Sequence, residues 1–358
     1  YTLAIRSAEA QFEASVADYD AVMLTLLADI AQSYLNIRTL QERIAVAKAN
    51  VLLQEQSFDI AKVKFEGGLV SELDMDQAEY LLYNTRALVH GFEESLQITK
   101  NSLAVLLGQT PQNLNPVMQQ VAPLPELAPN ISIGMPQDLI RRRPDIRGAE
   151  RLLAAQSYQI GFAINDLYPQ LTLGGSIGST VETVEGQDAD DMFTDDGLSW
   201  NVFGGFSWNV FNYGRLKSNV RLQDAAFQQL LVDYRNTILN AQAEVENSIV
   251  SYIQVQRQAT EYATATDATL RASSISQEQY QDGLVEFDTV INVLEALRSQ
   301  QDLLASTRGQ VATNLVQVYR SLGGGWEVRG TDLPDALLPQ ATKDQMLERT
   351  KYWEDKLP

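Results

Sequence analysis

The residues able to do chemistry in this chain are few, and most of them are carboxylates. Its 358 residues include no Cys and a single His, His90, which lies beside Gly91 in a helical pattern typical of a surface position. Without Cys there is no thiol nucleophile, disulfide framework or zinc–thiolate site, and one His excludes a multi-His metal centre. A Gly-rich phosphate loop and a nucleophile–base set are also absent from the sequence. We therefore expect no enzyme and no cofactor.

The densest group of carboxylates lies in residues 185–196, which contain no basic residue. Its acids are Glu185, Asp188, Asp190, Asp191, Asp195 and Asp196. A Ca²⁺ site at Asp188, Asp190 and Asp191 is conceivable, but the EF-hand spacing is absent. We therefore interpret the segment as a solvated loop and predict no metal site. The formal net charge of −19 excludes a nucleic-acid-binding protein, which needs clustered Lys and Arg.

Long helices are the elements that dominate the rest of the chain. Apolar residues alternate in steps of four and three from Phe12 to Phe65, a 3.5-residue period typical of coiled-coil packing. At about 1.5 Å per residue, such a helix is roughly 90–100 Å long. Gly67 and Gly68 end it, and a second helical pattern follows from Ser71 to Leu107. Residues 3–107 thus predict a long antiparallel helical hairpin.

The helical hairpin is repeated later in the chain. The segment Phe65 to Val70 aligns with Tyr280 to Val285, and Leu107 aligns with Leu322 at the same offset of 215 residues. The apolar stripe recurs between these points. A constant offset over such a length indicates a duplicated structural unit.

Between the repeats the period changes from 3.5 to 2, as in β-strands. Two alternating runs, over residues 170–181 and 198–210, carry apolar and aromatic residues on one face and polar residues and Gly on the other. Each run is long enough to cross a membrane as a tilted strand. A soluble β-hairpin flap is the alternative. The predicted lipid-facing residues are Leu171, Leu173, Ile177, Trp200, Val202, Phe206, Trp208 and Val210.

Four motifs follow one another along the chain: Asp138 to Arg147, Tyr168-Pro169-Gln170-Leu171, Phe211 to Arg215, and Leu322 to Trp326. In this order they resemble the TolC/OprM-type outer-membrane efflux proteins, in particular the NodT-like lipoproteins that serve RND tripartite pumps. The resemblance implies a mainly α-helical fold with a β-hairpin. Long duplicated coiled-coil hairpins would form an α-barrel in the periplasm, and the strands would join a β-barrel in the outer membrane of a homotrimer.

On this resemblance the chain divides into six segments. They are a first-repeat periplasmic helical hairpin (1–108), an equatorial connector (109–143), a helix (144–166), an outer-membrane β-hairpin with an acidic external loop (167–213), a second-repeat periplasmic helical hairpin (214–323) and a C-terminal equatorial tail (324–358).

The chain departs from the family in its strand number. The repeat offset places the counterparts of the helix at 144–166 and of both strands before residue 1. The chain therefore has two strands where the family has four. We expect it to be an N-terminally truncated piece of a longer protein, whose missing part holds the signal sequence and, in lipoprotein members, the acylated Cys.

The resemblance also implies a gate at the periplasmic helix tips, closed by carboxylates six or nine residues after the second tip Gly. Counting from Gly283 gives Thr289 and Asn292, neither of which is acidic. Asp288 or Glu286 could supply the charge instead, or Asn292 could close a polar constriction by hydrogen bonding. For Asp288, a plain role at a helix N-terminus is the alternative.

A link between the two tips is expected from the same resemblance. The family's linking acid falls on Asp74 and its Tyr partner on Tyr280, but its Arg partner falls on Val285 and is absent. For Asp74, simple N-terminal capping of a helix is the alternative.

The tips themselves resemble the family's docking surface for the periplasmic adaptor protein. They comprise Gly67, Gly68, Leu69, Val70 and Ser71 in the first repeat, and Gly283, Leu284 and Val285 in the second. We expect the apolar pairs Leu69-Val70 and Leu284-Val285 to be exposed and to suit contact with a partner, but they could equally make the hydrophobic contact of a helix C-cap.

The resemblance thus implies a passive exit duct for drugs or other small molecules, located in the bacterial outer membrane and extending into the periplasm. Its partners would be outer-membrane lipid, a periplasmic adaptor (membrane fusion) protein and an inner-membrane RND-type transporter, with no nucleic acid. An exit duct for type I protein secretion is one alternative. A soluble coiled-coil scaffold or adaptor is another, although it would have no use for a lipid-facing strand surface.

Overall fold

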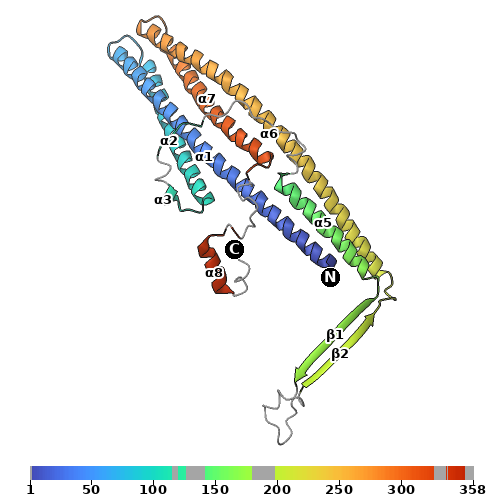
Figure 1. Cartoon of the computed structure of the whole chain (residues 1–358). Helices are drawn as coiled ribbons and strands as arrows, with labels where there is room; N and C mark the ends of the chain where they lie inside the picture. Colours follow the sequence, from blue (N-terminus) through green and yellow to red (C-terminus); the bar gives the residue numbers. More distant parts are fainter. Residues whose placement is uncertain are drawn as a thin grey trace. The chain divides into compact units, whose positions relative to one another are not determined.

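A computed structural model describes residues 2–114, 120–125, 142–179, 198–325, 336 and 338–350. Its helices and strands are labelled in Figure 1. In chain order they are α1 (Thr2–Glu66), α2 (Glu72–Leu106), α3 (Pro111–Leu114), α5 (Pro144–Asn165), β1 (Gln170–Ser179), β2 (Leu198–Ser207), α6 (Arg215–Gln281), α7 (Phe287–Ser321) and α8 (Gln340–Arg349). The described residues form a mainly helical fold with one two-stranded sheet, as the sequence predicts.

Two compact units make up the chain. One comprises residues 1–15 and 147–237, and the other comprises residues 16–146 and 238–358. The long helices α1 and α6 each contribute residues to both units. The predicted division into six segments is based on position relative to the membrane, whereas these two units are defined by compactness. The six-segment division therefore remains a prediction.

The duplicated hairpins are present as α1 with α2 and α6 with α7. Their loops end the first helix in the same way. Leu69 N donates to Lys64 O at 2.9 Å, and Leu284 N donates to Gln279 O at 2.8 Å. The intervening Gly68 and Gly283 have φ of 70° and 73°, a conformation that favours Gly. The predicted duplication is therefore confirmed at the level of local hydrogen bonding.

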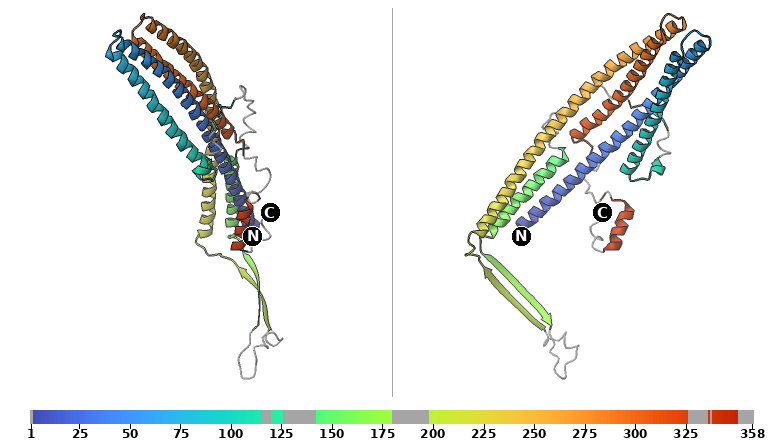
Figure 2. Two further views of the ribbon diagram at one scale, coloured as in Figure 1. Left: turned by 90° about the vertical axis from the view of Figure 1, so that its left-hand side faces the viewer. Right: turned by 180° about the vertical axis from the view of Figure 1, so that it is seen from behind.

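Apolar packing between the helices is divided among small clusters. Ile37 packs with Leu103 and Ala104 between α1 and α2, and Tyr252 packs with Val311 and Val318 between α6 and α7. The cluster at the tips is different because it joins all four helices. Its buried members are Ala61, Ala78, Leu81, Tyr280, Phe287, Val290 and Leu294. The two tips lie side by side in each view (Figures 1 and 2).

Behind this cluster the contact between the hairpins is polar. Asn50 Nδ2 donates to Gln301 Oε1 at 2.6 Å, and Gln277 Nε2 donates to Ser57 Oγ at 3.2 Å. Gln54 is 2% exposed, and neither its amide nitrogen nor its amide oxygen has a hydrogen-bond partner among the described residues. Such a surface gains less from burial than an apolar one, so the tip cluster is the main apolar contact between the hairpins.

In the other unit, α5 packs along the first residues of α1. Ser7 Oγ donates to Ala155 O at 3.1 Å, and Gln159 Nε2 donates to Ser7 Oγ at 2.8 Å. The start of α6 is joined to α5 through Gln156, whose amide donates to Gln223 Oε1 at 2.8 Å. These side chains position the segment from which the strands emerge.

The two strands form an antiparallel pair whose register aligns the apolar residues. Leu171 lies opposite Phe206, Ile177 lies opposite Trp200, and Val202 lies opposite Gly175. Residues directly opposite in a pair share one face of the sheet. The predicted apolar residues of both strands therefore lie on a single face.

The opposite face of the sheet carries small and polar groups. Ser176 Oγ donates to Asn201 Oδ1 at 3.0 Å across the pair. Phe203 is the exception, since its ring covers Gly174, where a Cβ atom would lie 2.6 Å from the ring. The two-faced character expected from the alternation is present over the described strand residues.

The second strand is shorter than its alternating pattern. β2 ends at Ser207, so the predicted strand residues Trp208 and Val210 lie beyond the last pair. Val210 N bonds to Trp208 O at 3.0 Å in a tight turn, and the Trp208 indole donates to Leu167 O at 3.2 Å. Local turn bonds thus replace the strand pairing that the alternation predicts.

Candidate functional site

The helix tips hold the side chains proposed as a gate, and Tyr280 lies at their centre. It comes from the last turn of α6 and is 5% exposed. Its ring centroid is 4.9 Å from that of Phe287, the first residue of α7. Ala61 of α1 and Leu81 of α2 belong to the same cluster, so Tyr280 of the second hairpin packs among buried apolar residues of the first.

The hydroxyl group of Tyr280 is buried and has no hydrogen-bond partner among the described residues. Burial raises the pKa of this phenol above its usual value, and the negative charge of Asp74 adds to the increase. Asp74 therefore acts on Tyr280 through its charge without accepting a hydrogen bond from it. The Asp74–Tyr280 link of the sequence analysis stays a prediction, and the structure gives it this electrostatic form.

Lys64, which the sequence analysis did not single out, makes the most direct contacts between the tips. Its ammonium donates to the main-chain oxygens of Tyr280 and Gln281, the latter at 3.3 Å. It also lies 4.2 Å from the centroid of the Tyr280 ring, in a cation–π contact. One signal was available in the sequence. The last turn of α1 has a basic residue, whereas the last turn of α6 has none.

The other gate candidates lie on the exposed side of the start of α7. Glu286 is the N-cap residue, and its side chain makes no capping bond. Asp288 lies in the first turn and accepts a hydrogen bond from Asn292 Nδ2 at 3.0 Å. Thr289 is exposed next to them. The buried Phe287 and Val290 face the opposite way, so the polar residues are directed away from the apolar cluster.

The predicted adaptor-contact residues divide into two kinds. Leu69 and Leu284 are 77% and 72% exposed, whereas Val70 and Val285 pack against the apolar tip cluster. Gly67, Gly68, Ser71 and Gly283 are exposed around them. Each tip therefore offers one uncovered Leu side chain and not the exposed apolar pair that the sequence analysis proposed.

A groove between the tips brings these residues together. It is lined by both loops and by Lys64, Asp74, Tyr280 and Asp288, among others. Lys64 is the single basic residue in this lining, against the four acids Asp74, Asp282, Glu286 and Asp288. The charge balance of the groove therefore depends strongly on one ammonium group.

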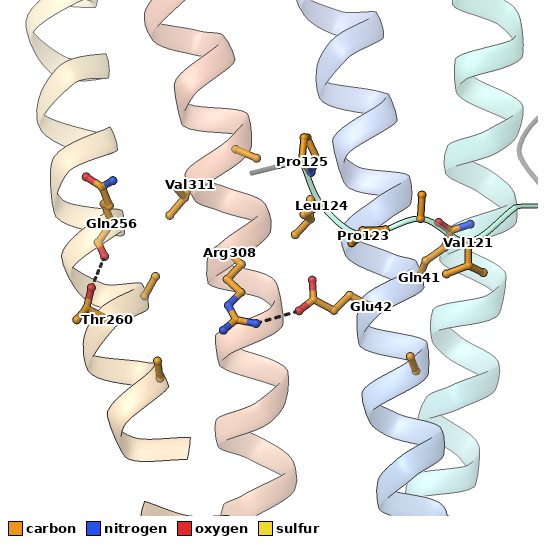
Figure 3. Close-up of a pocket in the computed structure, with 15 residues that line it drawn as sticks. Gln41, Glu42, Val121, Pro123, Leu124, Pro125, Gln256, Thr260, Arg308 and Val311 are labelled. Atoms are coloured by element: carbon orange, nitrogen blue, oxygen red, sulfur yellow. Dashed lines mark hydrogen bonds and ion pairs between the residues drawn. The ribbon is translucent and has the colours of Figure 1, made fainter. Parts of the chain in front are cut away.

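A second groove lies farther along the helices, where residues 121–125 run beside α1 (Figure 3). Its walls are mostly apolar and include Leu124 and Val311. Arg308 and Glu42 approach each other across it at 3.4 Å. Arg38 holds the start of the segment by donating to Gln120 O at 2.6 Å. This groove contains none of the predicted site residues.

On the strand pair, the predicted lipid-facing side chains are uncovered. Leu171, Leu173 and Ile177 of β1 are at least 75% exposed, and Trp200, Val202 and Phe206 of β2 are at least 64% exposed. Trp208 and Val210, beyond the strand end, are about half exposed. An apolar surface of this kind needs an apolar environment or a partner.

No helix in the described part of the chain combines the length and apolarity needed to cross a membrane. No group of three or more His, Asp or Glu side chains in those ranges could hold a metal ion. The acidic segment 185–196, with Asp188, Asp190 and Asp191, lies outside the described residues.

Comparison with known proteins identifies relatives over most of the chain. Residues 2–109 and 135–324 match a family described as outer membrane efflux protein. Nodulation protein T of Rhizobium leguminosarum bv. viciae is 29% identical over 329 residues, which is 91% of this chain and 66% of the relative. The pyoverdine export outer membrane protein OpmQ of Pseudomonas aeruginosa is 31% identical over 327 residues, 90% of this chain and 66% of the relative.

Among solved structures, the outer-membrane channel OprN superposes with a TM-score of 0.85 at 28% identity. The match covers 91% of this chain and 72% of that one. The chain thus spans just under two thirds of the length of the curated relatives it matches.

Proposed function

Because the chain belongs to the outer membrane efflux protein family, we propose that it is the larger part of an exit duct through which a tripartite pump releases small molecules from the cell. The protein is an outer-membrane protein, as the resemblance implied. In this role it does no chemistry. It supplies a path, and the inner-membrane partner supplies the energy.

One observation carries this proposal beyond family membership. The strand register collects Leu171, Ile177, Trp200 and Phe206 on one uncovered face and leaves Ser176 with its polar neighbours on the other. Side chains facing lipid and side chains facing a watery passage have these opposite preferences. A soluble scaffold would have to bury such an apolar face elsewhere.

The proposed partners are those that membership of the family implies. The whole protein would act as a homotrimer, in contact with outer-membrane lipid, a periplasmic adaptor protein and an inner-membrane RND-type transporter. The uncovered Leu69 and Leu284 are suited to the adaptor contact. Closure at the tips would involve Asp74, Tyr280, Glu286, Asp288, Thr289 and Asn292.

The names of the relatives suggest the kind of cargo. OpmQ is named for export of pyoverdine, and another relative, from Pseudomonas putida, is named for toluene efflux. We propose that this protein likewise conducts small molecules, with the choice among them made by the upstream transporter.

Two measurements on the full-length protein test the proposal. Reconstituted into planar lipid bilayers, it should produce single-channel currents, and a strain lacking its gene should become more susceptible to small toxic compounds. Absence of channel activity from correctly folded protein would refute the duct. Loss of a secreted protein, with unchanged susceptibility to small compounds, would favour type I secretion instead.

A further inference from the structure

The end of α6 is held by a side chain from the other hairpin. A helix C-terminus leaves main-chain oxygens without intrahelical partners and carries a partial negative charge, which a nearby cation stabilises. The last turn of α6 has no basic residue of its own. Lys64 of α1 supplies the cation by donating to the oxygens of Tyr280 and Gln281.

The backbone of Lys64 is held in place by a hydrogen bond within the first tip, so its side chain starts from a fixed position. Its carbonyl oxygen accepts the Leu69 N–H that closes the first tip. The Lys64 side chain is half-buried, and its ammonium also contacts the Tyr280 ring, 4.2 Å away at the centroid. One residue is therefore tied to both tips, to the first through its main chain and to the second through its side chain.

The charges around Lys64 make this contact difficult to replace. The groove between the tips is lined by four acids and no other basic residue. Without the ammonium group, like charges would face one another, and the exposed oxygens of α6 would add to the negative potential. Separation of the tips would then be favoured.

From these contacts we infer that Lys64 is the latch of the closed tips: opening the second hairpin requires its ammonium to leave the main-chain oxygens of Tyr280 and Gln281 and the face of the Tyr280 ring. This inference rests on the proposed duct function for its meaning in transport. The structural claim, that Lys64 joins the two tips, stands independently of what the duct carries.

The test compares three variants of the full-length protein in lipid. Lys64→Met removes the charge but keeps the apolar stem, and Lys64→Arg keeps a positive donor. Lys62→Met is the matched control, since Lys62 is exposed on the same helix and takes part in no hydrogen bond or ion pair among the described residues. Hydrogen exchange is followed at the amides of Gly283 and Leu284, with Gly324 at the other end of α7 as internal reference.

With the latch removed, the amides of Gly283 and Leu284 should exchange about 5–10-fold faster in Lys64→Met, because charge-assisted hydrogen bonds at the end of α6 are lost. Single-channel conductance without pump partners should rise several-fold in the same variant. Lys62→Met should match the wild type in both measurements, and Lys64→Arg should stay close to it.

Three results would overturn the latch. These are unchanged exchange at Gly283 and Leu284 in Lys64→Met, equal effects of Lys64→Met and Lys62→Met, or equal loss in Lys64→Arg and Lys64→Met. If Lys64→Met does not assemble, Lys64→Gln replaces it under the same criteria. A wild-type protein that forms no channel would refute the duct function, while the exchange rates would still decide the latch.

Discussion

Arg143 donates a hydrogen bond from its guanidinium to the main-chain oxygen of Ser321 at 2.7 Å. The same guanidinium bonds to Asp145 at 2.8 and 3.1 Å and to Glu244 at 2.8 Å. It thereby joins the last residue of α7, the first turn of α5 and the middle of α6. This is the opposite end of α7 from the tips, so the two ends of the helix are each secured by contacts with distant parts of the chain.

We expect Arg143→Met to destabilise the helical region by about 2–3 kcal/mol, since it removes the guanidinium that bonds to two carboxylates and a helix-end oxygen. The Arg143 side chain is only 12% exposed, so water replaces these bonds poorly. Thermal unfolding followed by circular dichroism measures the loss. Arg151→Met is the control: its pair with Glu13 is more than half exposed on both sides, and we expect less than about 0.5 kcal/mol. Equal effects of the two substitutions would contradict this account.

Gly323 should tolerate a side chain less well than its repeat counterpart Gly108. Both have positive φ, 73° and 65°. A Cβ on Gly323 would lie 3.1 Å from Arg143 Cα, whereas a Cβ on Gly108 would meet nothing within 4 Å. Gly108→Ala should cost about 1–2 kcal/mol for the backbone conformation alone. Gly323→Ala should cost about 1–3 kcal/mol more. Thermal unfolding of both variants measures the difference. A larger loss of stability in Gly108→Ala would show that the close approach of Gly323 to Arg143 is unimportant.

Removing the Tyr280 hydroxyl should leave the closed tips intact. Because this buried group has no hydrogen-bond partner, Tyr280→Phe should be neutral or stabilising by up to about 1 kcal/mol. Basal conductance should not rise. A clear increase in conductance would indicate instead that the hydroxyl bonds to Asp74 in the closed duct.

The closed tips should weaken at alkaline pH because of Tyr280. Its pKa is raised above the ordinary value of 10.0, so the folded tip favours the neutral phenol. The corresponding stability is present below about pH 10 and is lost as the pH rises through the raised pKa. Exchange rates at Gly283, measured from pH 8 to 11 and corrected for intrinsic exchange, should show this loss. The loss should be smaller in Tyr280→Phe, and an identical profile in both proteins would exclude Tyr280 as a cause.

Charge on the two faces of β1 should have unequal effects. Leu173→Arg places a cation on the uncovered apolar face of the strand pair. Thr172→Arg, at the adjacent residue of β1, places a cation on the opposite, polar face. Arg among lipid costs about 2–4 kcal/mol near the membrane centre. We expect Leu173→Arg to reduce the amount of folded protein in outer-membrane fractions and Thr172→Arg to have little effect. Equal recovery would argue against lipid on the Leu173 face.

Local rules were enough to predict the long helices and the two strands, but not the short helices α3 and α8. The 3.5-residue period of α1 and the Gly residues after α1 and α6 fix helix length and helix ends through bonds between near neighbours. The strand alternation correctly grouped Leu171, Ile177, Trp200 and Phe206. The same alternation was wrong for Trp208 and Val210, because turn bonds ended β2 earlier and alternation does not report where pairing stops.

The candidate site was predictable only in part. Tyr280, Asp74 and Asp288 were found through the repeat and the resemblance, and the structure places them around one groove. Lys64 was missed, since a Lys near a helix end is ordinarily a cap for its own helix. That its ammonium instead reaches the end of α6 depends on how two hairpins pack.

The sequence by itself determined the long helices, their ends, the duplication and the two-faced strands, since each follows from contacts within a few residues or from a regular period. Only the tertiary structure decided which side chains meet across the repeats. Lys64 reaches Tyr280 over 216 positions and Arg143 reaches Ser321 over 178. Such contacts depend on packing geometry, which no local pattern encodes.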